Sequence, residues 1–94
     1  MSIKTNAMKV SVWDTYVRRN DGRRMHFDIL VPSDLKDERT VFGFGTDYLK
    51  KKAVENHDLT TNECRFCHIE QASAEMVKEI DKRGYAIIEM ENCD

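Results

Sequence analysis

Three residues whose side chains could bind a metal or carry out thiol chemistry lie close together in the second half of this chain. Residues 63–70 have the sequence ECRFCHIE, which places Cys64, Cys67 and His68 within five positions. Thiolate and imidazole groups are common zinc ligands, and paired thiols perform disulfide exchange. The spacing therefore admits four interpretations: haem attachment, a metal site, a redox pair, or a strand whose thiols pack as small hydrophobic groups.

Haem attachment and redox chemistry receive the weaker support. Cys-x-x-Cys-His is the haem attachment pattern, but attachment normally follows export, and MSIKTNAMKV at the N-terminus has no apolar signal segment. A redox Cys-x-x-Cys normally stands at the start of a helix, whereas the next helix is expected only near Ser73. A thiol redox protein or enzyme that uses Cys64 and Cys67 is kept as an alternative function.

A zinc site is the sharper hypothesis, because a Cys-x-x-Cys pair usually supplies half of a structural tetrahedral site. The sequence has no second pair, so the other ligands would come singly from His26, His57, His68 or Cys93. His26 is attractive because Asp28, two residues further on, shares its strand face and could orient the imidazole. The predicted metal ligands are Cys64, Cys67, His68 and His26, with Cys93 as the substitute for His68.

The interpretation in which the thiols only pack in a strand is preferred to each of the other three. A free cysteine packs as a small hydrophobic residue, and Cys64 and Phe66 would alternate along a strand with Arg65 and Cys67 on the other face. Residues three apart on a regular strand point to opposite faces, so a site shared by both thiols requires a turn at Arg65-Phe66.

A hairpin is the clearest of the elements that must position these residues. Residues 8–18 and 24–31 are rich in β-branched and aromatic residues and predict two strands. Asp21-Gly22 predicts a two-residue type I′ turn, which pairs Tyr16 with Phe27 and Asp14 with Ile29. In that register, the face assigned to the core consists of Val10, Val12, Asp14, Tyr16, Phe27, Ile29 and Val31. The opposite face consists of Trp13, Thr15, Val17, His26, Asp28 and Leu30.

The remaining pattern predicts two helices and two strands. A helix is expected over 36–53, although Gly43 and Gly45 each oppose it by about 1 kcal/mol. A loop at 56–58 leads to a strand at 62–69, a helix between Ser73 and Gly84, and a final strand at 85–90. The order β-β-α-β-α-β predicts an α+β fold: a mixed four-stranded sheet with an N-terminal hairpin and both helices packed on one face. Residues 1–7 are expected to be a flexible tail, and residues 8–94 a single domain.

Composition narrows the functional classes. The 94 residues are 40% hydrophobic and 34% charged, with a net charge of −2, which is typical of a globular protein and gives no general attraction to nucleic acid. No apolar run is long enough to span a bilayer, and three cysteines do not suggest a disulfide framework. A cytoplasmic protein with reduced thiols is expected.

Two further features carry a functional and a simpler interpretation. Four arginines crowd the predicted hairpin tip and could bind an anion or RNA, but no aromatic residue is interleaved with them, so a solvated tip is preferred. These are Arg18, Arg19, Arg23 and Arg24. Asp14 on the predicted core face could be a general base, but hydrogen bonding or a shift of register that exposes it is preferred.

Several stretches in order resemble one family. VWDTYV at 12–17, MHFDILV at 25–31, ECRFCH at 63–68 and the ending YAIIEMENC are similar to a group of small, mostly bacterial proteins known as domain of unknown function 2024. The resemblance implies an α+β fold and no particular activity. Its marked positions are Trp13, Asp14, Thr15, Tyr16, His26, Phe27, Asp28, Cys64, Arg65, Phe66, Cys67 and His68. The Phe42–Gly45 stretch departs from the helix-friendly sequence expected there.

The favoured hypothesis is a small, non-enzymatic binding or interaction module. Its binding face would include Trp13, His26, Asp28, Cys64, Cys67 and His68, and in the sharper form that cluster holds zinc. No obligatory cofactor is expected, and zinc is the one candidate. A protein or small molecule is the expected partner, whereas nucleic acid and membrane are disfavoured.

Overall fold

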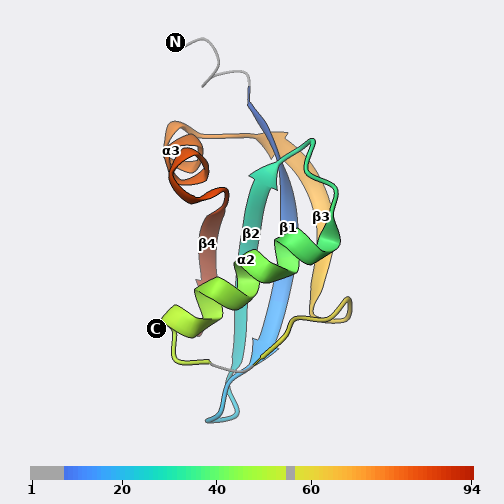
Figure 1. The fold of residues 1–94 in the computed structure, drawn as a ribbon. Coiled ribbons are helices and arrows are strands. Elements are labelled where there is room, and N and C mark those ends of the chain that lie inside the picture. The colour runs from blue at the N-terminus through green and yellow to red at the C-terminus, as the bar shows by residue number, and fades with distance from the viewer. Residues whose placement is uncertain (1–7, 55–56) are drawn as a thin grey trace.

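The computed structural model describes residues 8–54 and 57–94; the expected tail at 1–7 and Asn56 of the expected loop lie outside this part. The elements are β1 (Lys9–Arg18), β2 (Arg24–Pro32), α2 (Glu38–Lys51), β3 (Cys64–Gln71), α3 (Ala74–Arg83) and β4 (Ala86–Glu91) (Figure 1). The predicted α+β class and the order β-β-α-β-α-β are confirmed. No helix in the described residues is long and apolar enough to cross a membrane.

The four strands form one sheet in the order β3-β1-β2-β4. All three strand pairings are antiparallel, so the expectation of a mixed sheet was wrong. The hairpin of β1 and β2 lies at the centre, and the two later strands are added antiparallel on its outer sides. Element order does not fix strand order, and an antiparallel sheet can leave part of a face open to solvent.

The hairpin turn contains three residues rather than the predicted two. The Arg19 N–H donates to the Arg23 carbonyl at 2.8 Å, and the Gly22 N–H donates to the Arg19 carbonyl at 2.9 Å. Gly22 has a φ of +90°, whereas Asp21 is not among the residues with positive φ that a type I′ turn would require. The Asp21 carboxylate instead accepts from the Arg23 backbone N–H at 3.0 Å and from its Nε at 2.8 Å.

The longer turn shifts the register by one residue from the prediction. Asp14 pairs with Asp28 and Tyr16 pairs with His26, each one residue short of its predicted partner. Because side chains alternate, this shift moves Asp14 and Tyr16 off the face that holds Phe27, and the predicted core face was wrong. The residues of the hairpin that pack in the main core are Trp13, Val17, Met25, Phe27, Ile29 and Val31.

The two helices contact opposite faces of the sheet, although they were predicted on one face. In the main core α2 contributes Val41, Tyr48 and Leu49. A smaller core forms where Val77 and Ile80 of α3 pack with the alternate positions of the strands, which are Val10, Val12, Leu30 and Ala86. Both faces of the hairpin carry apolar residues, and the second set is shorter, so α3 covers only one end of its face.

The α3 helix is bounded by the residues that the sequence predicted. The Ser73 Oγ accepts from the Met76 N–H at 3.2 Å, and Gly84 adopts a left-handed conformation with a φ of +91°. In α2, Gly45 is required by packing, since a Cβ there would lie against Leu59 and 2.9 Å from the Ile29 Cδ1.

Candidate functional site

Three polar side chains converge on the sheet face that carries the smaller core, toward the hairpin end. Asp14 on β1 lies directly opposite Asp28 on β2, and His26 is two residues before Asp28 on the same strand face. The His26 Nε2 lies 2.6 Å from the Asp14 Oδ1 and 3.9 Å from the Asp28 Oδ1. The side chains of His26 and Asp28 are only 18% and 17% exposed, so both are mostly shielded from water.

Ionising both carboxylates of this cluster costs free energy, because two negative charges then lie close together in a partly buried place. The pKa of Asp28 is raised to about 6, chiefly by burial and then by the hydrogen bond with Asp14 and the negative charge of that carboxylate. The charges of His26 and His68 act in the opposite direction on the same pKa. A positive charge placed among these groups would relieve the repulsion and favour the ionised form.

The ring and the backbone of His26 are each held by a neighbouring residue. The Tyr16 ring stacks on it with centroids 4.0 Å apart and an interplanar angle of 15°, and Arg24 lies over the outer side of Tyr16 at 4.3 Å. The buried Cys93 Sγ donates to the His26 carbonyl at 3.2 Å and so ties the end of the chain to β2. A side chain packed in this way is pre-organised for binding.

The cysteines of ECRFCH lie in different environments. Cys64 is buried in the main core beneath α2, and burial raises the pKa of its thiol to about 11. Cys67 is exposed, and its Sγ lies 3.2 Å from the His68 Nδ1. The His68 Nε2 lies 2.8 Å from the Glu70 Oε1.

The predicted metal ligands are therefore not brought together in the described part of the chain. Cys64 faces the main core, Cys67 and His68 lie on the outer strand β3, and β1 separates that strand from His26 on β2. Among residues 8–54 and 57–94, the one group of three His, Cys, Asp or Glu residues with converging ligand atoms is Asp14, His26 and Asp28. The order of strands, which the sequence did not reveal, decides this outcome.

Trp13 and His57 also differ from the sequence-based expectation. Trp13, placed on the binding face by the predicted register, is only 6% exposed and packs in the main core. His57, one of the single ligands considered, pairs with Glu63 through its Nε2 at 2.8 Å. The residue that the sequence analysis missed as a partner is Asp14. Comparing the two alternative registers would have found it, because the observed one gathers Asp14, Tyr16, His26 and Asp28 on one face.

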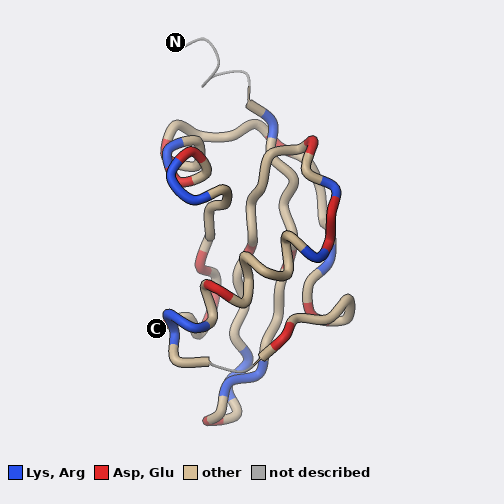
Figure 2. The backbone as a smooth tube through the Cα atoms, viewed as in Figure 1, with Lys and Arg blue, Asp and Glu red and all other residues tan. Residues whose placement is uncertain are grey.

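Basic positions gather near the hairpin tip (Figure 2). The four arginines there all make intramolecular contacts. Arg19 donates to the carbonyls of Asn92 and Asp94 at 2.9 and 2.7 Å, and Arg23 pairs with the carboxylates of Asp21 and Asp94. Arg18 donates to the Gly22 carbonyl at 3.1 Å, and Arg24 lies over Tyr16. Arg19 and Arg23 thus fasten the C-terminal residues to the hairpin, and Arg18 and Arg24 make contacts within it, which favours a structural role.

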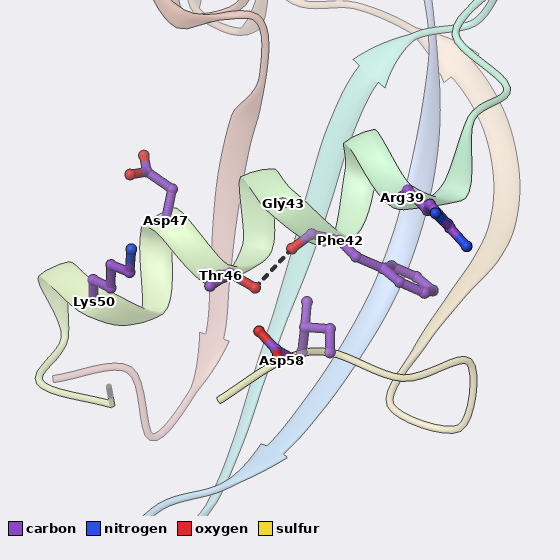
Figure 3. Close-up of a pocket in the computed structure, with 8 residues that line it drawn as sticks. Arg39, Phe42, Gly43, Thr46, Asp47, Lys50 and Asp58 are labelled. Carbon is purple, nitrogen blue, oxygen red and sulfur yellow. Dashed lines mark hydrogen bonds between the residues drawn. The ribbon is translucent and has the colours of Figure 1, made fainter. Parts of the chain in front are cut away.

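A shallow hollow of about 410 Å³ lies beside α2, on the other side of the sheet from the Asp-His-Asp cluster (Figure 3). Charges of both signs line it: Arg39, Asp47 and Lys50 are spread along the helix, and Asp58 lies on the loop beside it. Its polar groups do not converge on one point as those of the Asp-His-Asp cluster do. The cluster is therefore the stronger candidate site.

Fold and site together define a small α+β protein with a four-stranded antiparallel sheet and a histidine-carboxylate cluster on one face. The chain belongs to the family described as a domain of unknown function (DUF2024), whose model matches residues 8–90. It is similar to the NMR structure of protein NE1680 from Nitrosomonas europaea, a structural genomics target, with 39% identity and a TM-score of 0.79. That match covers 93% of this chain and 100% of the other. No curated protein matches the chain.

Proposed function

We propose that this protein is a small binding module that holds a divalent metal ion, zinc in the first instance, with Asp14, His26 and Asp28. The observation that carries the proposal is that one ligand atom from each residue lies within 4.8 Å of the other two. Ligands at about 2.0 to 2.2 Å from a tetrahedral zinc ion are roughly 3.4 Å apart, so small side-chain rotations would close the site.

The chemistry of the donors favours zinc or a similar first-row metal over calcium and magnesium. One imidazole and two carboxylates supply a nitrogen ligand, which calcium and magnesium sites rarely use, and too few oxygens for a calcium site. Three protein ligands leave the fourth position of a zinc tetrahedron for water or a small anionic ligand. A bound dication would also offset the repulsion between Asp14 and Asp28.

Zinc titration of metal-free protein, by calorimetry and by thermal unfolding, tests the proposal. Wild type is expected to bind one zinc ion and to melt at a higher temperature with zinc, because a ligand that binds the folded state stabilises it. His26→Gln is expected to lose most of this binding. His57→Gln is the matched control, since His57 also pairs with a carboxylate, at 2.8 Å, but lies outside the cluster.

Two results would count against the proposal. The first is a wild-type protein that does not bind zinc at pH 7. The second is binding that His26→Gln leaves unchanged, since the metal would then be held elsewhere. Free-thiol titration in the same samples separates the second case, because metal held by Cys67 would protect that thiol.

Cys67 carries a second candidate function, a nucleophilic thiol. If the Glu70 carboxylate accepts the N–H of the His68 Nε2, the Nδ1 faces the Cys67 thiol as a base. Cys64 would not be its disulfide partner, because it lies in the main core. Alkylation of native protein by iodoacetamide is expected to be fastest at Cys67 and to slow several-fold in His68→Gln. Equal rates in both proteins would exclude assistance by His68.

A further inference from the structure

We propose that two copies of this chain pair through β3, antiparallel, with Phe66 opposite Ile69 of the partner subunit and Arg65 opposite Glu70 of the partner subunit. A two-fold axis repeats both pairs, so each copy supplies all four residues. The proposal rests on the shape of the β3 edge and is independent of the metal site.

The β3 strand has the features of an interaction edge. It is the outermost strand beside β1, and it runs along the margin of the sheet in Figure 1. Residues 65–69 are all exposed, and they include two of the large apolar side chains that the described structure exposes most, Phe66 at 51% and Ile69 at 48%. A long edge strand with exposed apolar residues is prone to pair with another strand.

Two backbone hydrogen bonds fix which residues of β3 bond to β1. The Tyr16 N–H donates to the Glu63 carbonyl at 2.8 Å, and the Ala72 N–H donates to the Met8 carbonyl at 3.0 Å. Each of these bonds lies just beyond an end pair of the β1–β3 ladder. Bonded and non-bonded pairs alternate in an antiparallel ladder, so the two residues of each end pair do not exchange backbone hydrogen bonds with each other.

Hydrogen bonding alternates along an antiparallel strand, so the residues turned toward the open edge can be counted from each end of β3. Phe66 is the second residue after the first residue of β3, and Ile69 is the second residue before the last. The N–H and C=O groups of these two residues therefore face outward. A second β3 strand that placed its Ile69 opposite Phe66 would give a hydrogen-bond partner to the backbone N–H and C=O of both residues. The two-fold axis would repeat the same pair.

A β-bulge in β3 brings the side chains of Phe66 and Ile69 to the same face of the sheet, which this register requires. The ladder between β1 and β3 shifts between Val12 and Trp13, so β3 carries one extra residue between Phe66 and Ile69. Phe66 pairs with Trp13 and Ile69 pairs with Ser11, which share one sheet face although the two β3 residues are three apart. In a regular strand they would point to opposite faces and could not be partners across a two-fold axis.

The side chains are complementary in the same register. Arg65 and Glu70 pair with Asp14 and Val10 of β1, so both lie on the other sheet face and would meet as opposite charges across the axis. On the face beneath α2, Phe66 packs edge-on against Trp13 with centroids 6.0 Å apart. A hollow of about 310 Å³ beside these two rings would receive the partner's Ile69.

The dimer is expected to be weak and concentration-dependent, because one strand pair buries less area than a permanent interface. Sedimentation velocity of reduced protein up to about 0.5 mM covers this range of affinities. Arg65→Glu and Glu70→Arg should each raise the dimer dissociation constant by about tenfold or more, since each turns two attractive pairs into repulsive ones. An equimolar mixture of the two variants should form a heterodimer, because every charge pair is then attractive again.

One further test variant and one control variant complete the design. Ile69→Ser is expected to abolish the dimer, whereas Met90→Ser, at a residue that is 54% exposed on β4, is expected to leave it intact. Circular dichroism of each variant verifies folding. A wild type that stays monomeric up to the highest concentration overturns the proposal. A dimer whose dissociation constant neither charge reversal changes, or two variants that fail to associate when mixed, also overturns it.

Discussion

Asp28 is the residue at which binding and stability are expected to conflict. Its pKa is raised to about 6, first by burial and then by Asp14, so the folded protein holds this proton more tightly than the unfolded chain does. Stability from this group is therefore greatest at low pH, falls as pH rises from about 4 to about 6, and is level above that. At neutral pH, the two carboxylates are maintained at a cost in folding free energy.

Asp28→Asn should accordingly stabilise the metal-free protein by about 1 to 2 kcal/mol at pH 7, because it removes the charge that burial disfavours. The gain should shrink toward zero at about pH 4, where the wild-type residue is also neutral. Urea unfolding of both proteins at several pH values measures the difference. Asp81→Asn, at an exposed position of α3, is the control. A variant less stable than wild type at pH 7 would show that the Asp28 carboxylate is favourably paired.

The same titration predicts how zinc affinity depends on pH. Zinc requires the ionised carboxylate, so protonation of Asp28 competes with the metal. With a pKa of about 6, the ionised fraction falls about tenfold between pH 7 and pH 5, and affinity should fall by at least that factor. Calorimetry at the two pH values measures the change. An affinity independent of pH over this interval would place the metal away from Asp28.

At the scale of elements, α2 forms although it contains Gly43 and Gly45, two residues with poor helix propensity. Leu59 and Ile29 occupy the space beside Gly45, so packing offsets its poor helix propensity. Apart from its chain neighbours and its own helix backbone, Gly43 has no atom within 4 Å of the position that a Cβ would take. Sequence alone does not distinguish the two glycines, because the difference arises from the loop residue Leu59 and from β2.

The two glycines should therefore respond in opposite directions to alanine. Gly43→Ala is expected to stabilise the protein by about 0.5 to 1 kcal/mol through helix propensity. Gly45→Ala is expected to destabilise it by about 1 to 3 kcal/mol, because the new methyl group overpacks the core against Leu59 and Ile29. Chemical denaturation of the two variants side by side tests the pair. Equal effects would mean that Leu59 and Ile29 move aside without cost.

At the scale of the whole molecule, local signals predicted the elements, and only long-range pairing determined the site. Ser73 and Gly84 act within one helix, so α3 could be located from the sequence. The three-residue turn at Gly22 changed the register and thereby the partner of Asp14. The placement of β3 beside β1 separated the ECRFCH stretch from His26, and that placement depends on packing that no local motif encodes.

X-ray absorption spectroscopy of protein loaded with one equivalent of zinc tests the central claim most directly. Nitrogen and oxygen ligands lie about 2.0 to 2.2 Å from zinc, whereas thiolate sulfur lies at about 2.3 Å and scatters more strongly. A site made by Asp14, His26 and Asp28 predicts a first shell of nitrogen and oxygen alone, with the outer scattering of one imidazole. A sulfur shell would contradict it and return the metal to the cysteines of ECRFCH.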